Sequence, residues 1–140
     1  MAPTPAAVGK PQTEMLQSHL TAIAPDLECR TVTAMVTLEK TARGLMPCDV
    51  VFGCTDDNAG GLVLSRFSTF MATPVIDCGV LLGGDGALAS INGRVTTLTP
   101  GGACLVCRDR IDLARGQTEL RTPEERIRLE NEGYAPSWEA

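Results

Sequence analysis

Four hydrogen-bonding side chains follow a short apolar run near the middle of the chain. The run Val50–Phe52 ends at Gly53-Cys54, and the next residues are Thr55, Asp56, Asp57 and Asn58. In an open α/β sheet, ligands bind at the carboxyl ends of strands, where loop side chains meet the amides of the next helix. The pattern favours two roles for these residues, a cap for the following helix or a ligand site.

Six cysteines are scattered along the chain, and only Cys104-Leu-Val-Cys107 places two of them close together. Two thiolates at this spacing can bind one zinc ion, but a structural zinc site needs four ligands. No second pair of this kind is present, so we expect half a site at most. A free thiol pair and a redox pair are the alternatives. The cysteines at 29, 48, 54 and 78 are expected in or beside the sheet core, where a reduced thiol acts as a small hydrophobe.

Composition narrows the class of protein. The chain has 140 residues, 44% of them hydrophobic, and a net charge of −5, with one Trp and one Tyr. This length suits one domain, and the acidic balance with few aromatics disfavours nucleic-acid binding. No apolar run approaches the roughly 18 residues of a membrane span, and no signal peptide is recognisable. We therefore expect a cytoplasmic protein without membrane contact and without a disulfide framework.

The first half of the chain predicts a helix, a strand and a second helix. Residues 1–7 are rich in Pro and Ala and are expected to be disordered. Pro11 begins a helix with apolar residues at helical spacing, which Pro25 ends. Residues 27–36 alternate in the manner of a strand. Thr37 is then a candidate cap for a short helix over 38–45.

The second half predicts a β-α-β unit followed by antiparallel structure. Residues 49–80 contain two apolar strands around a helix, which implies a parallel sheet. Asn92-Gly93 predicts the turn of a hairpin between 87–91 and 94–98. From 108 to 132, interleaved charges predict one or two exposed helices, divided at Arg115-Gly116 and Thr122-Pro123. No phosphate-binding glycine motif is present, and the single histidine, His19, has no catalytic partner nearby in the sequence.

Three features in this order resemble the ThiF/MoeB/HesA family, the bacterial relatives of the ubiquitin-activating enzymes. They are Val8–Gln12 at the start of a helix, Gly53–Asp57 at the end of a strand, and the CxxC pair about 50 residues later. The resemblance extends to the strand at Pro74–Gly79 and covers almost the whole chain. It implies an α/β, Rossmann-like domain with a mainly parallel sheet, an antiparallel hairpin and a CxxC region.

The resemblance also implies a chemistry. Such a domain binds ATP and Mg²⁺ and adenylates the C-terminal carboxylate of a ubiquitin-like carrier protein that ends in Gly-Gly, and it can form a homodimer. Asp56 matches the family aspartate that serves Mg²⁺ and the phosphates, a role suited to hard carboxylate oxygens. Thr55, Asp57, Asn58, Lys10 and Gln12 are the accompanying nucleotide-site candidates. Cys104 and Cys107 match half of the family's zinc site.

The chain also departs from the family pattern. Gln12 stands where a lysine is usual, Asp57 where Asn is usual, and Gly61 where an arginine is common. The family's glycine-rich loop has no counterpart, and neither does its second cysteine pair. We therefore expect residues 8–140 to form a partial ThiF-type domain with an incomplete adenylation site. The alternative function is a non-catalytic module for zinc binding, carrier binding or dimerisation, and a nicotinamide-dependent oxidoreductase fragment is a third.

Overall fold

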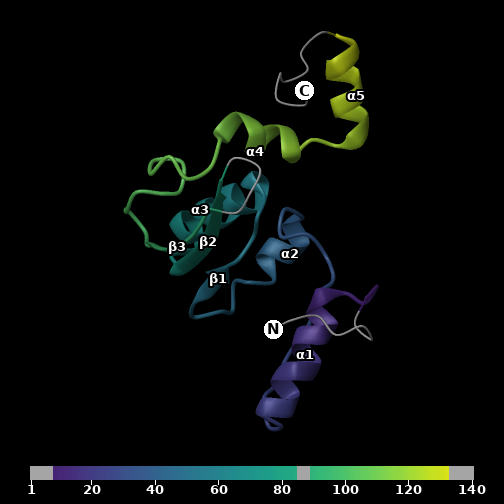
Figure 1. Ribbon diagram of the computed structural model, residues 1–140, viewed down its shortest axis with the longest axis vertical. Coiled ribbons are helices and arrows are strands. Elements are labelled where there is room, and N and C mark those ends of the chain that lie inside the picture. Colours follow the sequence, from purple (N-terminus) through teal and green to yellow (C-terminus); the bar gives the residue numbers. More distant parts are fainter. Residues whose placement is uncertain (1–7, 85–88, 133–140) are drawn as a thin grey trace. The chain divides into compact units, whose positions relative to one another are not determined.

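The computed structural model describes residues 8–84 and 89–132. The chain divides into two compact units, Met1–Met35 and Val36–Ala140. The first unit contains helix α1 (Gln12–Ile23), and the second contains a three-stranded sheet and four helices, shown in Figure 1. Residues 1–7, for which the sequence predicts disorder, lie outside the described residues. Within the described residues, no helix is both long and apolar enough to cross a membrane.

Helix α1 forms where the sequence predicts it. Pro11 is its N-cap residue, and Ile23 is its last residue, two positions before Pro25. None of its residues is buried. The segment that follows folds back along the helix, since Gln17 Nε2 donates to the Cys29 carbonyl at 2.9 Å and the hydroxyls of Thr13 and Thr33 lie 3.1 Å apart.

The predicted strand over 27–36 is wrong. No part of this segment pairs with another described strand, and its apolar residues are largely exposed, including Leu27, Val32 and Met35. Alternation along the sequence predicts a strand only if a partner supplies the ladder hydrogen bonds. Here the side-chain contacts to α1 take the place of such a ladder.

Helix α2 (Glu39–Arg43) is shorter than predicted, and its N-cap is Leu38 rather than Thr37. No side chain caps it. An ion pair one turn apart supports the helix, with Arg43 Nε 2.7 Å from Glu39 Oε1.

The β-α-β unit is confirmed. Strand β1 (Val51–Gly53) pairs in parallel with β2 (Val75–Gly83), and α3 (Asn58–Met71) connects them. Strand β2 also pairs in antiparallel register with β3 (Ser90–Leu98), which gives a mixed sheet in the order β1-β2-β3. The domain is therefore a Rossmann-like α/β structure.

The antiparallel hairpin exists, but its turn is not at Asn92-Gly93. These two residues lie inside β3 and pair with Leu81 and Val80 of β2. The type I′ turn that Asn-Gly usually forms needs positive φ at both positions, and neither residue has it. The two strands instead connect across 84–89, part of which lies outside the described residues.

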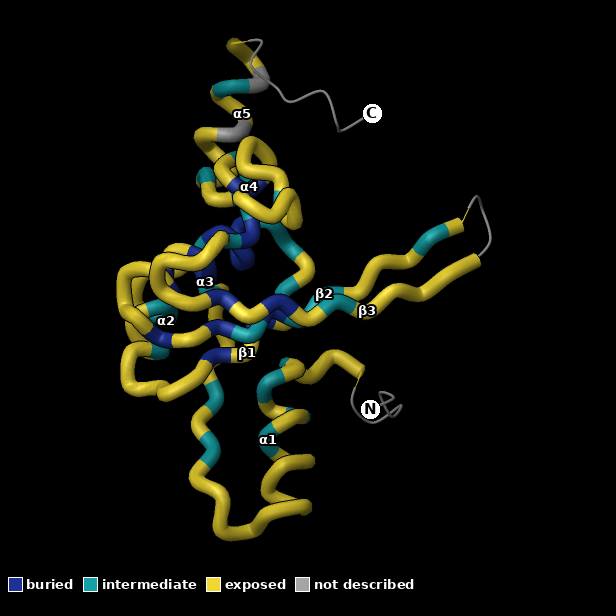
Figure 2. The backbone as a smooth tube through the Cα atoms, turned by 90° about the vertical axis from the view of Figure 1, so that its left-hand side faces the viewer, coloured by how far each residue is buried: buried dark blue, intermediate teal, exposed yellow. Residues whose placement is uncertain are grey.

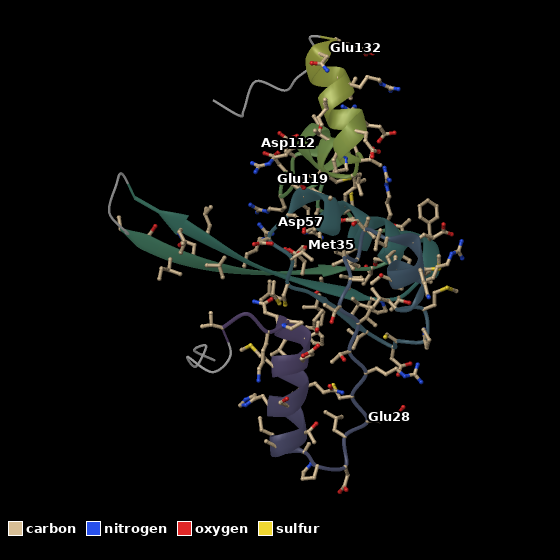
Figure 3. The ribbon with its side chains drawn as sticks, turned by 90° about the vertical axis from the view of Figure 1, so that its right-hand side faces the viewer. Glu28, Met35, Asp57, Asp112, Glu119 and Glu132 are labelled. Carbon is tan, nitrogen blue, oxygen red and sulfur yellow. The ribbon has the colours of Figure 1, made fainter. Side chains whose placement is uncertain are left out.

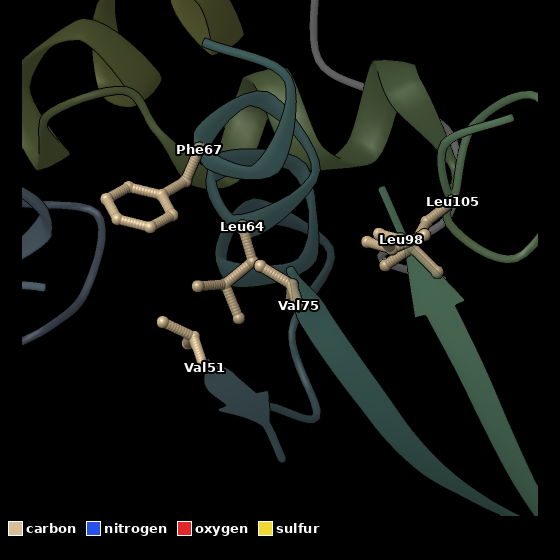
Figure 4. Packing of buried hydrophobic residues seen from close by; sticks show 6 residues of the cluster. All are labelled: Val51, Leu64, Phe67, Val75, Leu98 and Leu105. Carbon is tan, nitrogen blue, oxygen red and sulfur yellow. The ribbon is translucent and has the colours of Figure 1, made fainter. Parts of the chain in front are cut away.

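One face of the sheet carries the core. Six buried residues from three strands, one helix and one loop form it, as Figure 4 shows: Val51, Leu64, Phe67, Val75, Leu98 and Leu105. Helix α3 is also tied to this face by its serines. Ser68 Oγ donates to the Leu98 carbonyl at 3.1 Å, and Ser65 Oγ accepts from the Leu105 amide at 3.4 Å.

The opposite face of the sheet is largely exposed, and so are the outer stretches of β2 and β3, which are mostly yellow in Figure 2. Side chains alternate between faces along a strand, and the residues out of phase with the core are exposed apolar ones such as Phe52, Val80, Leu82 and Val95. A doubly wound sheet covers both faces with helices, but the described part of this unit covers one.

Helices α4 (Leu113–Glu119) and α5 (Pro123–Asn131) follow the CxxC loop. The predicted break at Arg115-Gly116 is wrong, because both residues lie inside α4. Gly116 is there for close packing: a Cβ at this position would lie 3.2 Å from the Asn58 carbonyl of α3. The predicted start of α5 is confirmed, since Thr122 and Glu125 cap each other's amides at 3.2 and 2.9 Å.

Because the core lies on one face of the sheet, truncating a leucine on that face and one outside the core should change the free energy of unfolding by different amounts. Leu98 is 3% exposed and Leu82 is 64% exposed. We expect Leu98→Ala to lower the free energy of unfolding by about 2–5 kcal/mol, because it leaves a cavity. Leu82→Ala should change it by less than about 0.5 kcal/mol. Urea unfolding followed by circular dichroism checks both, and equal losses would contradict this assignment of the core.

Candidate functional site

A cleft of about 800 Å³ lies at the carboxyl end of β1, beside the middle of β2. The loop from Cys54 to Asn58 forms one wall, the middle of β2 and β3 forms another, and Arg110-Ile111 closes a third side. This is the position at which open α/β sheets bind ligands. All of its residues belong to the second unit, so the cleft is described entirely within one compact body.

The structure gives the four adjacent polar residues of the loop different roles. Asp57 is the N-cap of α3, and its carboxylate accepts from the Gly60 amide. Gly60 makes this approach possible, because a Cβ there would lie 2.7 Å from Asp57 Oδ1 and 3.0 Å from the Thr55 methyl. The capping role that the sequence suggested is therefore filled by Asp57.

Asn58 connects α3 to α4. Its Oδ1 accepts from the Asp112 amide at 2.9 Å, and its Nδ2 donates to Glu119 Oε1 at 3.3 Å. The other oxygen of Glu119 accepts from the Ala59 amide at 2.8 Å. Figure 3 labels Asp57, Asp112 and Glu119, which gather at this end of α3.

The carboxylates of Asp57 and Glu119 reduce the ability of the α3 N-terminus to bind an anion. The first amides of a helix are a ready site for a phosphate, but those of Ala59 and Gly60 already bind Glu119 and Asp57. A ligand anion would compete with both carboxylates for these amides and be repelled by their charge. Phosphate binding at this helix terminus is thus disfavoured.

Asp56 is exposed in the cleft wall and makes no hydrogen bond or ion pair within the described residues. Its carboxylate oxygens are therefore available to a hard cation such as Mg²⁺. Thr55 lies beside it, half-buried and also lining the cleft. Of the polar residues that the sequence singled out here, these two remain for a ligand.

Three charged residues of the cleft were missed by the sequence reasoning. Asp77 on β2 is 5% exposed, and its Oδ2 lies 3.0 Å from an Arg94 guanidinium nitrogen. Arg94 reaches it across Gly79, its register partner. Arg110 is exposed at the cleft and forms no ion pair within the described residues. Asp77 had a sequence signal, a charge within an apolar strand, whereas Arg110 had none.

Gly61 departs from the family pattern for a visible reason. It is buried in the wall of the cleft, and a Cβ there would lie 3.1 Å from Ile111 and 3.5 Å from Leu105. The segment from Leu105 to Ile111 occupies the space that a longer side chain would need. Arg94 and Arg110 are the cations that the cleft contains instead.

Two thiols also line the cleft. Cys54 is exposed and Cys78 is half-buried, so both lie beside the sheet and neither is in the core, one of the two positions that the sequence suggested. Loss of hydration raises the pKa of the Cys54 thiol, and the neighbouring Cys78 and Asp77 raise it further. Both cysteines lie in the cleft because the end of β1 is in register with Asp77, the residue before Cys78 in β2.

Cys104 and Cys107 come together as predicted from their spacing, with their sulfurs 3.4 Å apart. The Cys107 amide donates to Cys104 Sγ at 3.5 Å, and this contact lowers the pKa of the Cys104 thiol. Across residues 8–84 and 89–132, however, no three His, Cys, Asp or Glu side chains are arranged to hold a metal ion. The described residues do not support a zinc site beyond this pair.

Lys10 and Gln12 lie in the first unit. Lys10 is exposed and precedes α1, and Gln12 is the first residue of that helix. The structure brings Thr55–Asn58 together in one wall of the cleft. Lys10 and Gln12 belong to the other compact unit, so they are described apart from the cleft.

The fold defines a Rossmann-like α/β domain, and the cleft at the end of β1 is its candidate ligand site. The model of the ThiF family matches residues 3–131. The chain therefore belongs to the ThiF family, the ubiquitin-activating-enzyme-like adenylyltransferases, whose members generally use ATP and Mg²⁺ and act on ubiquitin-like carrier proteins. No curated protein matches the chain.

The division of roles between Asp56 and Asp57 predicts different effects of the same substitution at adjacent positions. Asp57→Ala removes the cap of α3 and should lower the free energy of unfolding by about 1 kcal/mol. Asp56→Ala removes a carboxylate that has no hydrogen-bond or ion-pair partner among the described residues, and it should change this free energy by less than about 0.5 kcal/mol. Urea titrations of the two variants check this, and a larger loss for Asp56→Ala would reverse the assignment.

Proposed function

We propose that this chain takes part in the ATP-dependent adenylation of a ubiquitin-like carrier protein, and that its cleft forms the Mg²⁺ and phosphate side of the nucleotide site. The observation that supports this most directly is Asp56, an unpartnered carboxylate in the wall of a strand-end cleft. Membership of the ThiF family supplies the reaction class.

The residues of the cleft fit Mg·ATP in part. Asp56 offers hard oxygens to the cation, and Arg110 offers an exposed guanidinium to a phosphate. Arg94 is shared with Asp77, so part of its charge is already neutralised. The amides at the start of α3 are capped. Binding through this cleft should thus rest on the cation and the arginines.

When bound, Mg·ATP supplies the phosphoanhydride that a carboxylate consumes on adenylation, with release of pyrophosphate. The part of this chain is to orient the phosphates and to neutralise their charge. Asp56 would hold the cation, and Arg110 would lie over the phosphates. Lys10 and Gln12 stay candidates for the nucleotide site, and Cys104 with Cys107 stays a candidate half-site for zinc.

Nucleotide binding is the first test. Because the cleft has neither a glycine-rich loop nor free helix amides, we expect binding weaker than micromolar, dependent on Mg²⁺ and centred on the Cys54–Asn58 loop. Amide chemical shifts in a ¹⁵N-labelled sample titrated with Mg·ATP measure this. Asp56→Asn should abolish the Mg²⁺-dependent shifts, whereas Asp49→Asn, the same change at an exposed position outside the cleft, should leave them.

Shifts that persist in Asp56→Asn, or that do not need Mg²⁺, would remove Asp56 from the site. Micromolar affinity would show that groups other than Asp56 and the two arginines of the cleft contribute to phosphate binding.

A non-catalytic module that binds the carrier is the second candidate function. It is favoured by the engagement of Asp57 and Asn58 within the protein, which leaves few groups for catalysis. Release of pyrophosphate from Mg·ATP, in the presence of a carrier protein ending in Gly-Gly, separates the two functions. Adenylation predicts release that needs the carrier and falls at least tenfold in Asp56→Asn. Carrier binding without any release would support the module.

A further inference from the structure

Cys54 and Cys78 occupy matching positions on two neighbouring segments, Cys54 directly after β1 and Cys78 within β2. Gly53 of β1 is in register with Asp77 of β2, and these cysteines are the next residues on each side. Neighbouring strands lie about 4.8 Å apart, and disulfides join Cα atoms that are about 4.4–6.8 Å apart. Side chains at matching positions of paired strands project to the same face. The two thiols are therefore within reach of a direct bond.

Both thiols are also accessible to a small reagent, because both line the cleft. Cys54 is exposed and Cys78 is half-buried, and neither belongs to the hydrophobic core. No part of the proposed adenylation uses a thiol at either position. A pair of accessible cysteines with no packing role and no catalytic role needs a different explanation.

The remaining cysteines do not offer the same arrangement. Cys29 lies in the first unit, and Cys48 lies before β1 and does not line the cleft. Cys104 and Cys107 form their own pair within one loop. Among the described cysteines, Cys54 and Cys78 are the two that lie on neighbouring segments of the sheet. A bond between them would link the loop that contains Asp56 to β2.

We propose that Cys54 and Cys78 are a redox-active dithiol that forms a reversible disulfide in the wall of the cleft. A small disulfide of the glutathione class is the oxidant. The Cys54 thiolate attacks one sulfur of the oxidant and releases its first thiol, which leaves a mixed disulfide. The Cys78 thiolate then attacks Cys54 Sγ and releases the second thiol. The protein loses two electrons and two protons, and the oxidant is reduced to two thiols.

Peptide mapping tests this without any nucleotide, so its result is independent of the proposed adenylation. The protein is incubated with oxidised glutathione, free thiols are alkylated, and a tryptic digest is examined by mass spectrometry. Cys54 falls in peptide 44–66 and Cys78 in peptide 67–94. We expect these two peptides to become linked within a monomer and to separate on treatment with dithiothreitol.

Cys48 shares peptide 44–66 with Cys54 and provides the matched control. Cys48→Ser should keep the link, whereas Cys54→Ser and Cys78→Ser should each abolish it. A bond between Cys104 and Cys107 is recognised separately as an internal disulfide of peptide 95–108. The proposal is overturned if the wild-type protein forms the 95–108 disulfide without the 44–66 to 67–94 link. It is also overturned if the link persists in Cys54→Ser or is found only in dimers.

Discussion

The contact on which the second unit most depends is the occupation of the α3 N-terminus by two carboxylates of the protein itself. Asp57 caps the Gly60 amide from the strand-end loop, and Glu119 binds the Ala59 amide from α4. The partial positive charge of a helix terminus makes both contacts favourable. Together they fix the loop that follows β1, the first turn of α3 and the position of α4, and the loop and the start of α3 line the cleft.

This arrangement sets the chemistry that the cleft can offer. A helix terminus that holds two carboxylates is a poor anion site, so a phosphate ligand must be held by a cation or by arginines. Asp56 is left without a partner and faces the cleft, while its neighbour is consumed by the cap. The separation of a structural and a ligand-binding carboxylate at adjacent positions follows from the geometry of the first helical turn, in which only one of them can reach the Gly60 amide.

The hydrophobic core covers only part of the three-stranded sheet. Val51, Val75 and Leu98 are in register across three strands and pack against α3, while the residues that alternate with them are exposed or half-buried. The core is therefore one layer deep on one face. The hairpin of β2 and β3 continues past α3 with apolar residues on its surface, including Val80, Leu82 and Ile91. In this outer part, the pairing of β2 and β3 depends more on backbone hydrogen bonds than on side-chain burial.

The sequence by itself determined the local elements whose signals lie within a few residues. The β-α-β unit, the start of α1 at Pro11 and the capping of α5 by Thr122 all depend on periodicity or cap chemistry that neighbours in the chain supply. The CxxC spacing likewise placed two thiols together. The family resemblance was also readable from the motifs, and the family match over residues 3–131 confirms it.

Tertiary structure decided whatever required a distant partner. Residues 27–36 alternate like a strand but pair with no strand in the part of the chain that the structure describes. Asn92-Gly93 belongs to a ladder because β2 extends to meet it. Gly116 looked like a break and serves close packing against α3. The local pattern alone could not tell which of Thr55, Asp56 and Asp57 caps α3, nor that Glu119, about 60 residues away, binds the neighbouring amide of Ala59. Such contacts depend on the packing of separate elements, which no local pattern records.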